Sequence, residues 1–331
     1  MNENISLADI HDEDLEVVVR RLTAEDIGRL LVHRDEFVEL SCAACHGTEL
    51  AFDFEAHGFA YKRCTRCGLL LLSPAPDAAR QLWYIANSEA LRFWRERMPQ
   101  SIRGSRTKMY DERADYVRAR LRKYGVAGRR ALEIGAGNGE FAEAYVRAAD
   151  PPVERMVLVE PQPLSLQLPQ VEVIDSLLEA WSSAERFDLA VSWEVLEHVL
   201  DPDPMLRSIL QRLTPGGLLV LSTPNENSVE TRLLKGRSSN LLYDHVRLYN
   251  PHTLALLLQR LGFEVLEIET PGQLDVEIIQ REYSKGGLDL SDQPALQFLM
   301  EEGFQFRAEF QSFLCKHKLS GHMRCVARRP E

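Results

Sequence analysis

The chain has 331 residues, which is long enough for a complete hydrophobic core and a smaller module beside it. A formal net charge of −11 at pH 7 and a pI near 5.4 argue against nucleic acid as the main partner, because phosphate binding requires a basic surface. No signal peptide opens the sequence and no apolar run approaches the ~20 residues of a membrane span, so we expect a cytoplasmic protein without a membrane segment.

Residues 1–40 predict an acidic helical segment. Apolar residues recur at helical spacing from Leu15 to Leu31. We expect one or two amphipathic helices here, whose polar side is either a solvated acidic face or a surface for a partner.

Residues 41–76 predict a zinc ribbon. Two C-x-x-C pairs are separated by eighteen residues, and Gly68 favours a tight turn after the second pair. The four thiols are those of Cys42, Cys45, Cys64 and Cys67. Four thiolates form a tetrahedron that suits Zn²⁺ and leaves no open position, so we expect a structural ion, with redox-active pairs as the alternative. A strand over Leu69–Leu72 and a proline-containing linker follow.

Residues 77–128 predict a basic helical connector. Arginine and lysine outnumber the acids here, aromatic residues are interleaved, and apolar residues keep helical spacing until Gly125 and Gly128. A solvated helix face that neutralises the acidic N-terminal segment is one explanation of the basic charge.

A glycine-rich turn between a strand and a helix predicts a ligand site. The strand is expected over Ala131–Ile134 and the helix over Glu140–Ala149. The turn consists of Gly135, Ala136, Gly137, Asn138 and Gly139. Its G-x-G-x-G spacing differs from the G-x-G-x-x-G of a pyrophosphate site, and Glu133 disfavours a phosphate but favours an ammonium group. A second strand, Met156–Val159, ends at Glu160, where an acid reaches ribose hydroxyls in this topology.

This pattern resembles the class I S-adenosylmethionine (SAM)-dependent methyltransferases. The resemblance covers roughly Ala131 to Ala327. It implies an α/β fold with a Rossmann-like, seven-stranded sheet whose last strand is antiparallel, over residues 129–331. It also implies that the turn and Pro161 contact SAM, that Glu133 faces its ammonium group, and that Glu160 holds its ribose.

The resemblance gives the connector a second explanation. In this family the helices before the glycine turn lie over the cofactor and help to form the acceptor pocket. Arg103, Arg106 and Lys108 would then meet an anionic group of the acceptor, such as a nucleotide-linked sugar. The two explanations stay open at the level of the sequence.

Two further strands follow. Val171–Ile174 ends at Asp175, and in the resembled family an acid at this strand end reaches the adenine amino group. The alternative is that Asp175 caps a helix over Leu177–Trp181. The fourth strand is predicted over Phe187–Ser192, and ligands bind beyond the carboxyl ends of such strands.

The sequence E-x-x-E-H follows the fourth strand. At a helix start, this spacing places Glu194, Glu197 and His198 on one side. It resembles metal-assisted O-methyltransferases, among them small-RNA 2′-O-methyltransferases and ubiquinone-pathway enzymes, which implies a divalent ion such as Mg²⁺ that lowers the pKa of an acceptor hydroxyl. The plainer alternative in the superfamily is that Trp193 and Glu194 line the cofactor and that His198 is a polar pocket residue or a base.

His245 is the residue that we favour as the catalytic base, because an imidazole in a polar loop can accept a proton near neutral pH. Asp244-His245 looks similar to the acid-histidine pair of zinc-bearing sugar C-methyltransferases. Leu242 stands where that family has a tyrosine, however, and that family's extra C-terminal domain is missing. In the metal-assisted enzymes a histidine here would be the last ligand, and a buried structural histidine is a further alternative.

The remaining elements complete the expected sheet. A helix over Asp201–Leu213 leads through a P-G-G turn to a fifth strand over Leu218–Ser222. A helix over His252–Leu261, a sixth strand over Phe263–Glu269 and an antiparallel seventh strand over Met323–Ala327 follow. The helical insertion at residues 273–320 carries a phenylalanine stripe that we expect in a core. The stripe is Phe298, Phe304, Phe306, Phe310 and Phe313, and Cys315 and Cys325 are expected to be ordinary buried residues.

The function expected from the resemblance is transfer of a methyl group from SAM to a small acceptor, with oxygen favoured over carbon and a sugar-like or secondary-metabolite acceptor. His245 or His198 would remove the proton, with Glu197 beside them. The alternatives are a sugar C-methyltransferase, a zinc-ribbon RNA methyltransferase, and a scaffold that has kept the fold without the activity.

Overall fold

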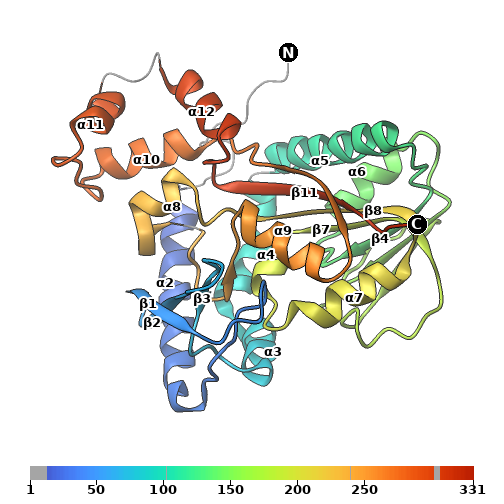
Figure 1. The fold of residues 1–331 in the computed structure, drawn as a ribbon, viewed down its shortest axis with the longest axis horizontal. Helices are drawn as coiled ribbons and strands as arrows, with labels where there is room; N and C mark the ends of the chain where they lie inside the picture. The colour runs from blue at the N-terminus through green and yellow to red at the C-terminus, as the bar shows by residue number, and fades with distance from the viewer. Residues whose placement is uncertain (1–12, 102, 239, 302–305) are drawn as a thin grey trace.

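The computed structural model describes residues 13–101, 103–238, 240–301 and 306–331. A seven-stranded sheet with the order β10-β11-β8-β7-β4-β5-β6 organises the large domain (Figure 1). β11 runs antiparallel to both of its neighbours, and the other neighbouring pairs are parallel. The strands are β4 (Arg130–Ile134), β5 (Arg155–Val159), β6 (Val171–Ile174), β7 (Phe187–Trp193), β8 (Leu213–Pro224), β10 (Glu264–Glu269) and β11 (His322–Arg328). The predicted Rossmann-like sheet with an antiparallel last strand is confirmed.

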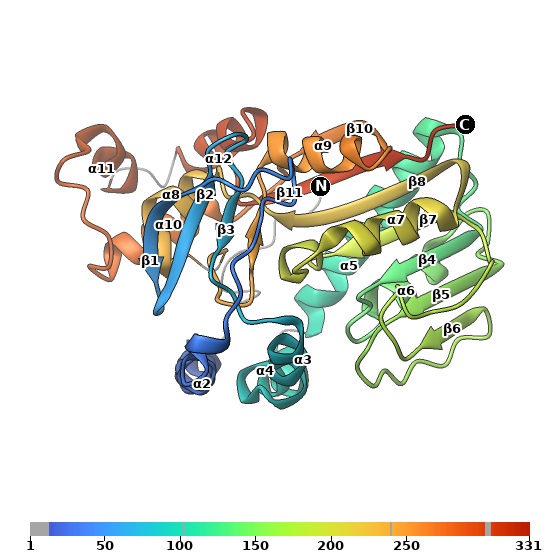
Figure 2. The same cartoon turned by 60° about the horizontal axis from the view of Figure 1, so that its bottom comes forward.

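Helices cover both faces of this sheet because successive side chains of a strand point to opposite sides (Figure 2). Ala131 of β4 packs into the cluster under α5 and α6, whereas its neighbour Leu132 packs into the cluster under α7 and α9. These helices are α5 (Arg103–Tyr124), α6 (Glu140–Ala148), α7 (Pro202–Arg212) and α9 (Pro251–Arg260). Asn250 begins α9 with a capping box. Among the helices of the described residues, none has the length and apolar character of a membrane span.

The N-terminal third forms a second, smaller body around the ribbon. Its four-stranded sheet has the order β1-β2-β3-β9, so a strand from the large domain completes the ribbon. Leu70 pairs with Leu248 and Leu71 with Arg247. The elements are α2 (Glu13–Leu31), η1 (Arg34–Glu36), β1 (Leu50–Ala56), β2 (Phe59–Cys64), β3 (Leu70–Leu72), α3 (Ala78–Asn87), α4 (Glu89–Ser101) and β9 (Arg247–Leu248). The division at residues 40, 76 and 128 stays a prediction, and residues 1–12 of the acidic segment lie outside the described residues.

The insertion forms a helical cap at one end of the molecule (upper left in Figure 1). Its small core consists of aliphatic residues, among them Val276, Ile279 and Leu314. The helices are α10 (Asp275–Ser284), α11 (Pro294–Glu301) and α12 (Arg307–Lys316), and α8 (Val229–Leu234) with η3 (Lys235–Arg237) lies before them in the chain. α8 contacts α10, which joins the cap to the large domain.

The predicted core position of the phenylalanine stripe is wrong for most of its members. Phe298, Phe306 and Phe313 are 55%, 41% and 50% exposed. Phe310 packs partly against the core of the cap, and Phe304 lies outside the described residues. Because aliphatic side chains already fill this small core, the aromatic rings remain on its outside.

Two predicted boundaries in the large domain also need correction. Leu177–Trp181 forms a turn and not a helix, so Asp175 caps no helix there. β8 begins at Leu213 rather than Leu218, because Leu213 already pairs with Phe187 of β7. The P-G-G segment is an irregularity between this pair and the regular pairing that starts at Leu218, and within it Gly216 N donates to the carbonyl of Arg329. Of the remaining cysteines, Cys325 is buried as expected, whereas Cys315 is only partly buried.

Candidate active site

The glycine turn lies where β4 meets α6, at the carboxyl edge of the sheet. All three of its glycines have positive φ, which favours glycine over any other residue. A Cβ at Gly135 would lie 2.4 Å from Cγ2 of Val195, whereas a Cβ at Gly137 would meet nothing within 4 Å. The turn is therefore packed against the protein at Gly135 and open at Gly137, as a backbone that receives a ligand must be. Ala136 is buried and Asn138 is exposed between them.

Glu133 lies on β4, two residues before this turn, and one of its carboxylate oxygens lacks a hydrogen-bond partner among the described residues. Its side chain is buried, and the oxygen without a partner is Oε2. Burial raises the pKa of Glu133 well above its ordinary value, and the charge of Arg113 opposes that rise. A buried carboxylate oxygen without a donor fits a site that is completed by a cationic group.

Glu160 stands at the end of β5, beside the turn. Its carboxylate accepts from the backbone N–H of Gly137 at 3.0 Å and from that of Gln162 at 3.1 Å. These bonds aim the acid at the open side of the glycine turn, next to the exposed Pro161. Asp175, at the end of the neighbouring β6, is exposed and free to face a ligand at the same edge.

Arg113 of α5 is a site residue that the sequence-based prediction missed. Its guanidinium lies over the ring of Trp193, 5.0 Å from the centroid, and over that of Tyr110 at 5.2 Å. Arg106, which the sequence left open between an anionic acceptor and a solvated helix face, forms a two-bond ion pair with Glu140. Because Arg113 follows Arg106 by seven residues, helical spacing could have identified it as lying on the same side.

Glu194 follows Trp193 at the end of β7, in a left-handed conformation with φ of 53°. It accepts a hydrogen bond from the hydroxyl of Ser222, and its Oε2 lies 3.3 Å from Nδ1 of His322. Burial opposes ionisation of this carboxyl, but His322, Arg113 and Ser222 outweigh it and lower the pKa of Glu194 to about 2. Glu194 is therefore ionised and already held from two sides.

Glu197, His198 and His245 form a compact group at the same edge. One ligand atom from each lies within 4.8 Å of the others. The E-x-x-E-H segment forms only the short helix η2 (Leu196–His198), and Glu194 does not join this group. The four-ligand set that the sequence suggested is thus reduced to three residues.

The two imidazoles of this group are oriented as metal ligands usually are. His198 Nδ1 lies 3.1 Å from the carbonyl of Asp244, and His245 Nδ1 lies 3.0 Å from that of Asn240. Their Nε2 atoms are left for another partner, and the ring centroids are 4.7 Å apart. Oε2 of Glu197 accepts from Thr223, and its Oε1 is buried without a partner among the described residues.

The pKa values of His245 and Glu197 favour a role as metal ligands over a role as a strong base. Burial, followed by the neighbouring His198, lowers the pKa of His245 to about 4. Burial and the charge of Glu194 raise the pKa of Glu197 well above its ordinary value. A neutral imidazole binds a cation directly, and a carboxyl of raised pKa is one that a cation would ionise.

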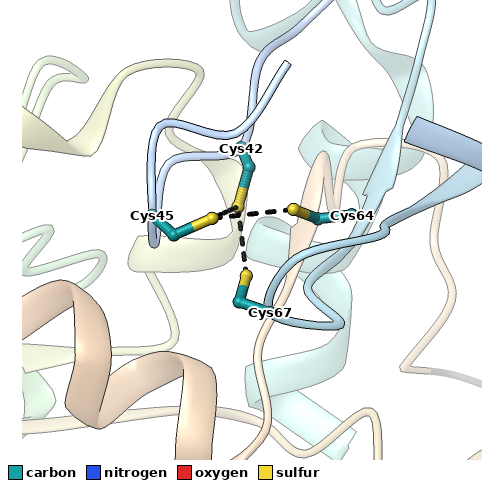
Figure 3. A group of neighbouring side chains, drawn as sticks. All are labelled: Cys42, Cys45, Cys64 and Cys67. Atoms are coloured by element: carbon teal, nitrogen blue, oxygen red, sulfur yellow. Dashed lines mark hydrogen bonds between the residues drawn. The ribbon is translucent and has the colours of Figure 1, made fainter. Parts of the chain in front are cut away.

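The four ribbon cysteines converge on one point (Figure 3). The Sγ atoms of Cys42 and Cys67 are 3.3 Å apart, and Cys45 Sγ lies 3.6 Å from both Cys42 and Cys64. All four are free thiols, and four sulfurs at ~2.3 Å from a tetrahedral Zn²⁺ would be about 3.8 Å apart. The residues fit a closed zinc site, which would hold the ribbon and take no part in the chemistry.

The ribbon supports the loop that carries His245. β9 begins two residues after His245 and pairs with β3 of the ribbon. Arg247 donates to the carbonyls of Ser41 and Leu200, which ties the first cysteine knuckle to the segment after E-x-x-E-H. Tyr61 of the ribbon also donates to the carbonyl of Leu242 at 3.3 Å. The four-cysteine cluster and the loop that carries His245 are therefore joined by hydrogen bonds and strand pairing.

Comparison with known families identifies the large domain. Residues 106–268 match the family described as "Methyltransferase domain". Together with the strand order and the glycine turn, this match assigns the large domain to the class I SAM-dependent methyltransferases. The family expected from the sequence is confirmed.

The individual relatives match only part of this chain, at modest sequence identity. The chain is similar to a protein named ubiquinone biosynthesis O-methyltransferase from Xanthomonas oryzae pv. oryzae, at 36% identity over 122 residues, which are 34% of this chain and 49% of that one. A protein of the same name from Paracidovorax citrulli is 26% identical over 175 residues, 48% of this chain and 72% of that one. The chain thus spans about half the length of the first relative. The solved N-methyltransferase NodS from Bradyrhizobium japonicum WM9 is 19% identical, with a TM-score of 0.39 over 66% of this chain and 96% of that chain, which is too distant to indicate an acceptor.

Proposed function

We propose that this protein transfers the methyl group of SAM to an oxygen atom of a small-molecule acceptor. The observation that carries the proposal is the surroundings of the glycine turn: the unpartnered oxygen of Glu133, the open approach over Gly137, and the acid Glu160 at the next strand end. The ammonium group, the methionine chain and the ribose of SAM match these three features in turn.

Arg113 gives this cofactor site a fourth contact. Its charge acts on Glu133, and its guanidinium lies over the ring of Trp193. The carboxylate of the methionine part of SAM is the group that a guanidinium beside an ammonium-binding acid would receive. The sulfonium itself activates the methyl group, so the protein has to align donor and acceptor, exclude water and remove a proton.

Oxygen is favoured as the acceptor atom because of Glu197, His198 and His245. These residues fit a divalent cation, which when bound would lower the pKa of an acceptor hydroxyl. Two imidazoles and one carboxylate suit Mn²⁺ or Zn²⁺ better than the Mg²⁺ suggested by the sequence. The name O-methyltransferase of the relatives agrees with this assignment. Without a metal, His245 or His198 stays the sequence-based choice for the base.

The class of the acceptor is a separate question from the acceptor atom. A sugar-like or secondary-metabolite acceptor stays an expectation from the sequence, and the pairing of Arg106 with Glu140 removes one argument for an anionic group on it. Carbon methylation, an RNA acceptor gripped by the ribbon, and an inactive scaffold are the remaining alternatives.

Two measurements test the proposal. SAM binding by calorimetry should be detected, and its absence would restore the scaffold alternative. With methyl-labelled SAM, a panel of phenols, nucleotide-linked sugars, amines and RNA should give a product in which mass spectrometry finds the label on oxygen. Label found on carbon, nitrogen or RNA alone would contradict the assignment to oxygen of a small molecule.

A further inference from the structure

His322, which the sequence did not single out, begins β11 at the edge of the sheet that carries the site. It pairs opposite Pro224, at the carboxyl end of β8. Because β8 lies between β11 and β7, His322 stands two strand spacings, or about 10 Å, from the strand that ends at Trp193. The antiparallel seventh strand thus adds a third histidine to the edge where His198 and His245 lie.

His322 is held by an acid. Its Nδ1 atom lies 3.3 Å from Oε2 of Glu194, and the other oxygen of that carboxylate accepts from Ser222. The carboxylate is fixed on both sides, so it orients the imidazole and leaves the Nε2 atom of His322 pointing away from the pair. An acid that orients an imidazole in this way sets its tautomer and supports the positive charge that it acquires on accepting a proton.

The side chain of His322 is accessible, since 57% of it is exposed. The charges of Arg113 on α5 and of Asp275 on α10 act on it. An acceptor can therefore reach the imidazole beside Glu194, which follows Trp193 at the end of β7.

The other two histidines are placed differently. His245 is buried and packs edge-on against His198, and each uses its Nδ1 atom on a backbone carbonyl. His198 and His245 are suited to hold a divalent cation in place, whereas His322 is accessible to an incoming acceptor. Glu194 links the two groups, since its charge acts on both Glu197 and His245.

We propose that His322, oriented by Glu194, is the general base that takes the proton from the acceptor hydroxyl during methyl transfer. This inference rests on the proposed function. An electron pair of the hydroxyl oxygen forms the new O–C bond, the C–S bond of SAM breaks with its electron pair going to sulfur, and the O–H proton moves to Nε2 of His322. The positive charge of the sulfonium ends as the imidazolium, so the step is balanced.

The charges that face His322 give this step a pH dependence. Burial disfavours its charged form, but Glu194 and Asp275 outweigh burial and Arg113, and the pKa of His322 is raised. Glu230 of α8 also interacts with it. Because a base must be unprotonated, kcat/KM should rise with pH through the pKa of His322. Removing the charge of Glu194 should move this rise to lower pH.

The test compares two phenolic acceptors, catechol and 4-nitrocatechol, with the full chain, saturating SAM and added Mn²⁺. Catechol keeps its proton near neutral pH, as phenols of pKa about 10 do, whereas the nitro group makes 4-nitrocatechol ionise near neutral pH without a base. For catechol, His322→Gln should lower kcat/KM by about 10²–10⁴-fold, remove the rise with pH, and leave the Kd for SAM within about twofold. For 4-nitrocatechol the loss should be at least about tenfold smaller.

Two further variants keep the result interpretable. His317→Gln changes an exposed histidine near the end of α12 and should behave as wild type. Glu194→Gln should shift the pH rise for catechol downward, which a purely structural loss would not do. Equal losses of kcat/KM for both acceptors, or an unchanged pH profile in His322→Gln, would overturn the inference while leaving the proposed function intact. Wild-type protein that methylates neither acceptor on oxygen would overturn the inference together with its premise of a phenolic hydroxyl acceptor.

Discussion

Replacing Glu133 with glutamine should weaken SAM binding and stabilise the protein without SAM. The two effects have one cause, a carboxylate buried without a partner for one of its oxygens. In the SAM complex that oxygen would accept from the ammonium group, and a hydrogen bond to a charged group contributes about 1.5–3 kcal/mol. We therefore expect the Kd for SAM to rise about 10- to 150-fold in Glu133→Gln.

The effect on stability has the opposite sign and depends on pH. Burial raises the pKa of Glu133 in the folded protein above its ordinary value of 4.5, so the folded state binds its proton more tightly than the unfolded chain does. Stability must then fall as pH rises past 4.5, until the folded pKa is passed. Glutamine removes this loss, so the difference in Tm between variant and wild type should be small at pH 4.5 and should grow toward pH 8.

Differential scanning calorimetry at both pH values and titration calorimetry with SAM measure the two effects. Glu143→Gln, an exposed acid on α6, is the control and should change neither quantity. If Glu133→Gln lowered both Tm and SAM affinity, its role would be in the fold and not toward the ammonium group. An unchanged Kd would separate Glu133 from the cofactor altogether.

Four further predictions concern other parts of the site. His245→Ala should keep SAM affinity and reduce turnover at least ~100-fold, and equal turnover would remove His245 from the mechanism. Gly135→Ala should lower Tm and weaken SAM binding, because its Cβ would meet Val195 at 2.4 Å, whereas an unaltered variant would show that the turn can shift. Zinc analysis should give one ion per chain. Cys45→Ser should lose that ion, lower Tm and impair turnover more than SAM binding, because the ribbon pairs with β9 beside the loop that carries His245. Full turnover in Cys45→Ser would show that the ribbon does not support the active site. Chelation should reduce turnover, with recovery on Mn²⁺ in the wild type but not in Glu197→Ala, and chelator-resistant turnover would favour a metal-free site.

Local pattern was sufficient for most of the large domain. The strand over Val171–Ile174 has the predicted bounds, and the helix predicted from His252 begins one residue earlier, at Pro251, after the capping residue Asn250. The glycine turn and the cysteine pairs were also predictable, because the residues that favour positive φ and those that bind a metal stand within a few positions of one another in each motif. Prediction was wrong where pairing partners are distant in the sequence, as at Leu213, which pairs with Phe187 and so extends β8 beyond the predicted strand.

What the sequence by itself determined is the chemistry of each short motif: an acid before a glycine turn, an acid after the next strand, four thiols, and histidines in two loops. What only the tertiary structure decided is which of these side chains lie close to one another. It joined His245 to His198, turned Glu194 away from them toward His322, and brought Arg113 over Trp193. The reason is physical: the sheet places the ends of β7, β8 and β11 side by side although His322 follows Pro224 by 98 positions in the sequence. No local periodicity indicates that these residues are neighbours.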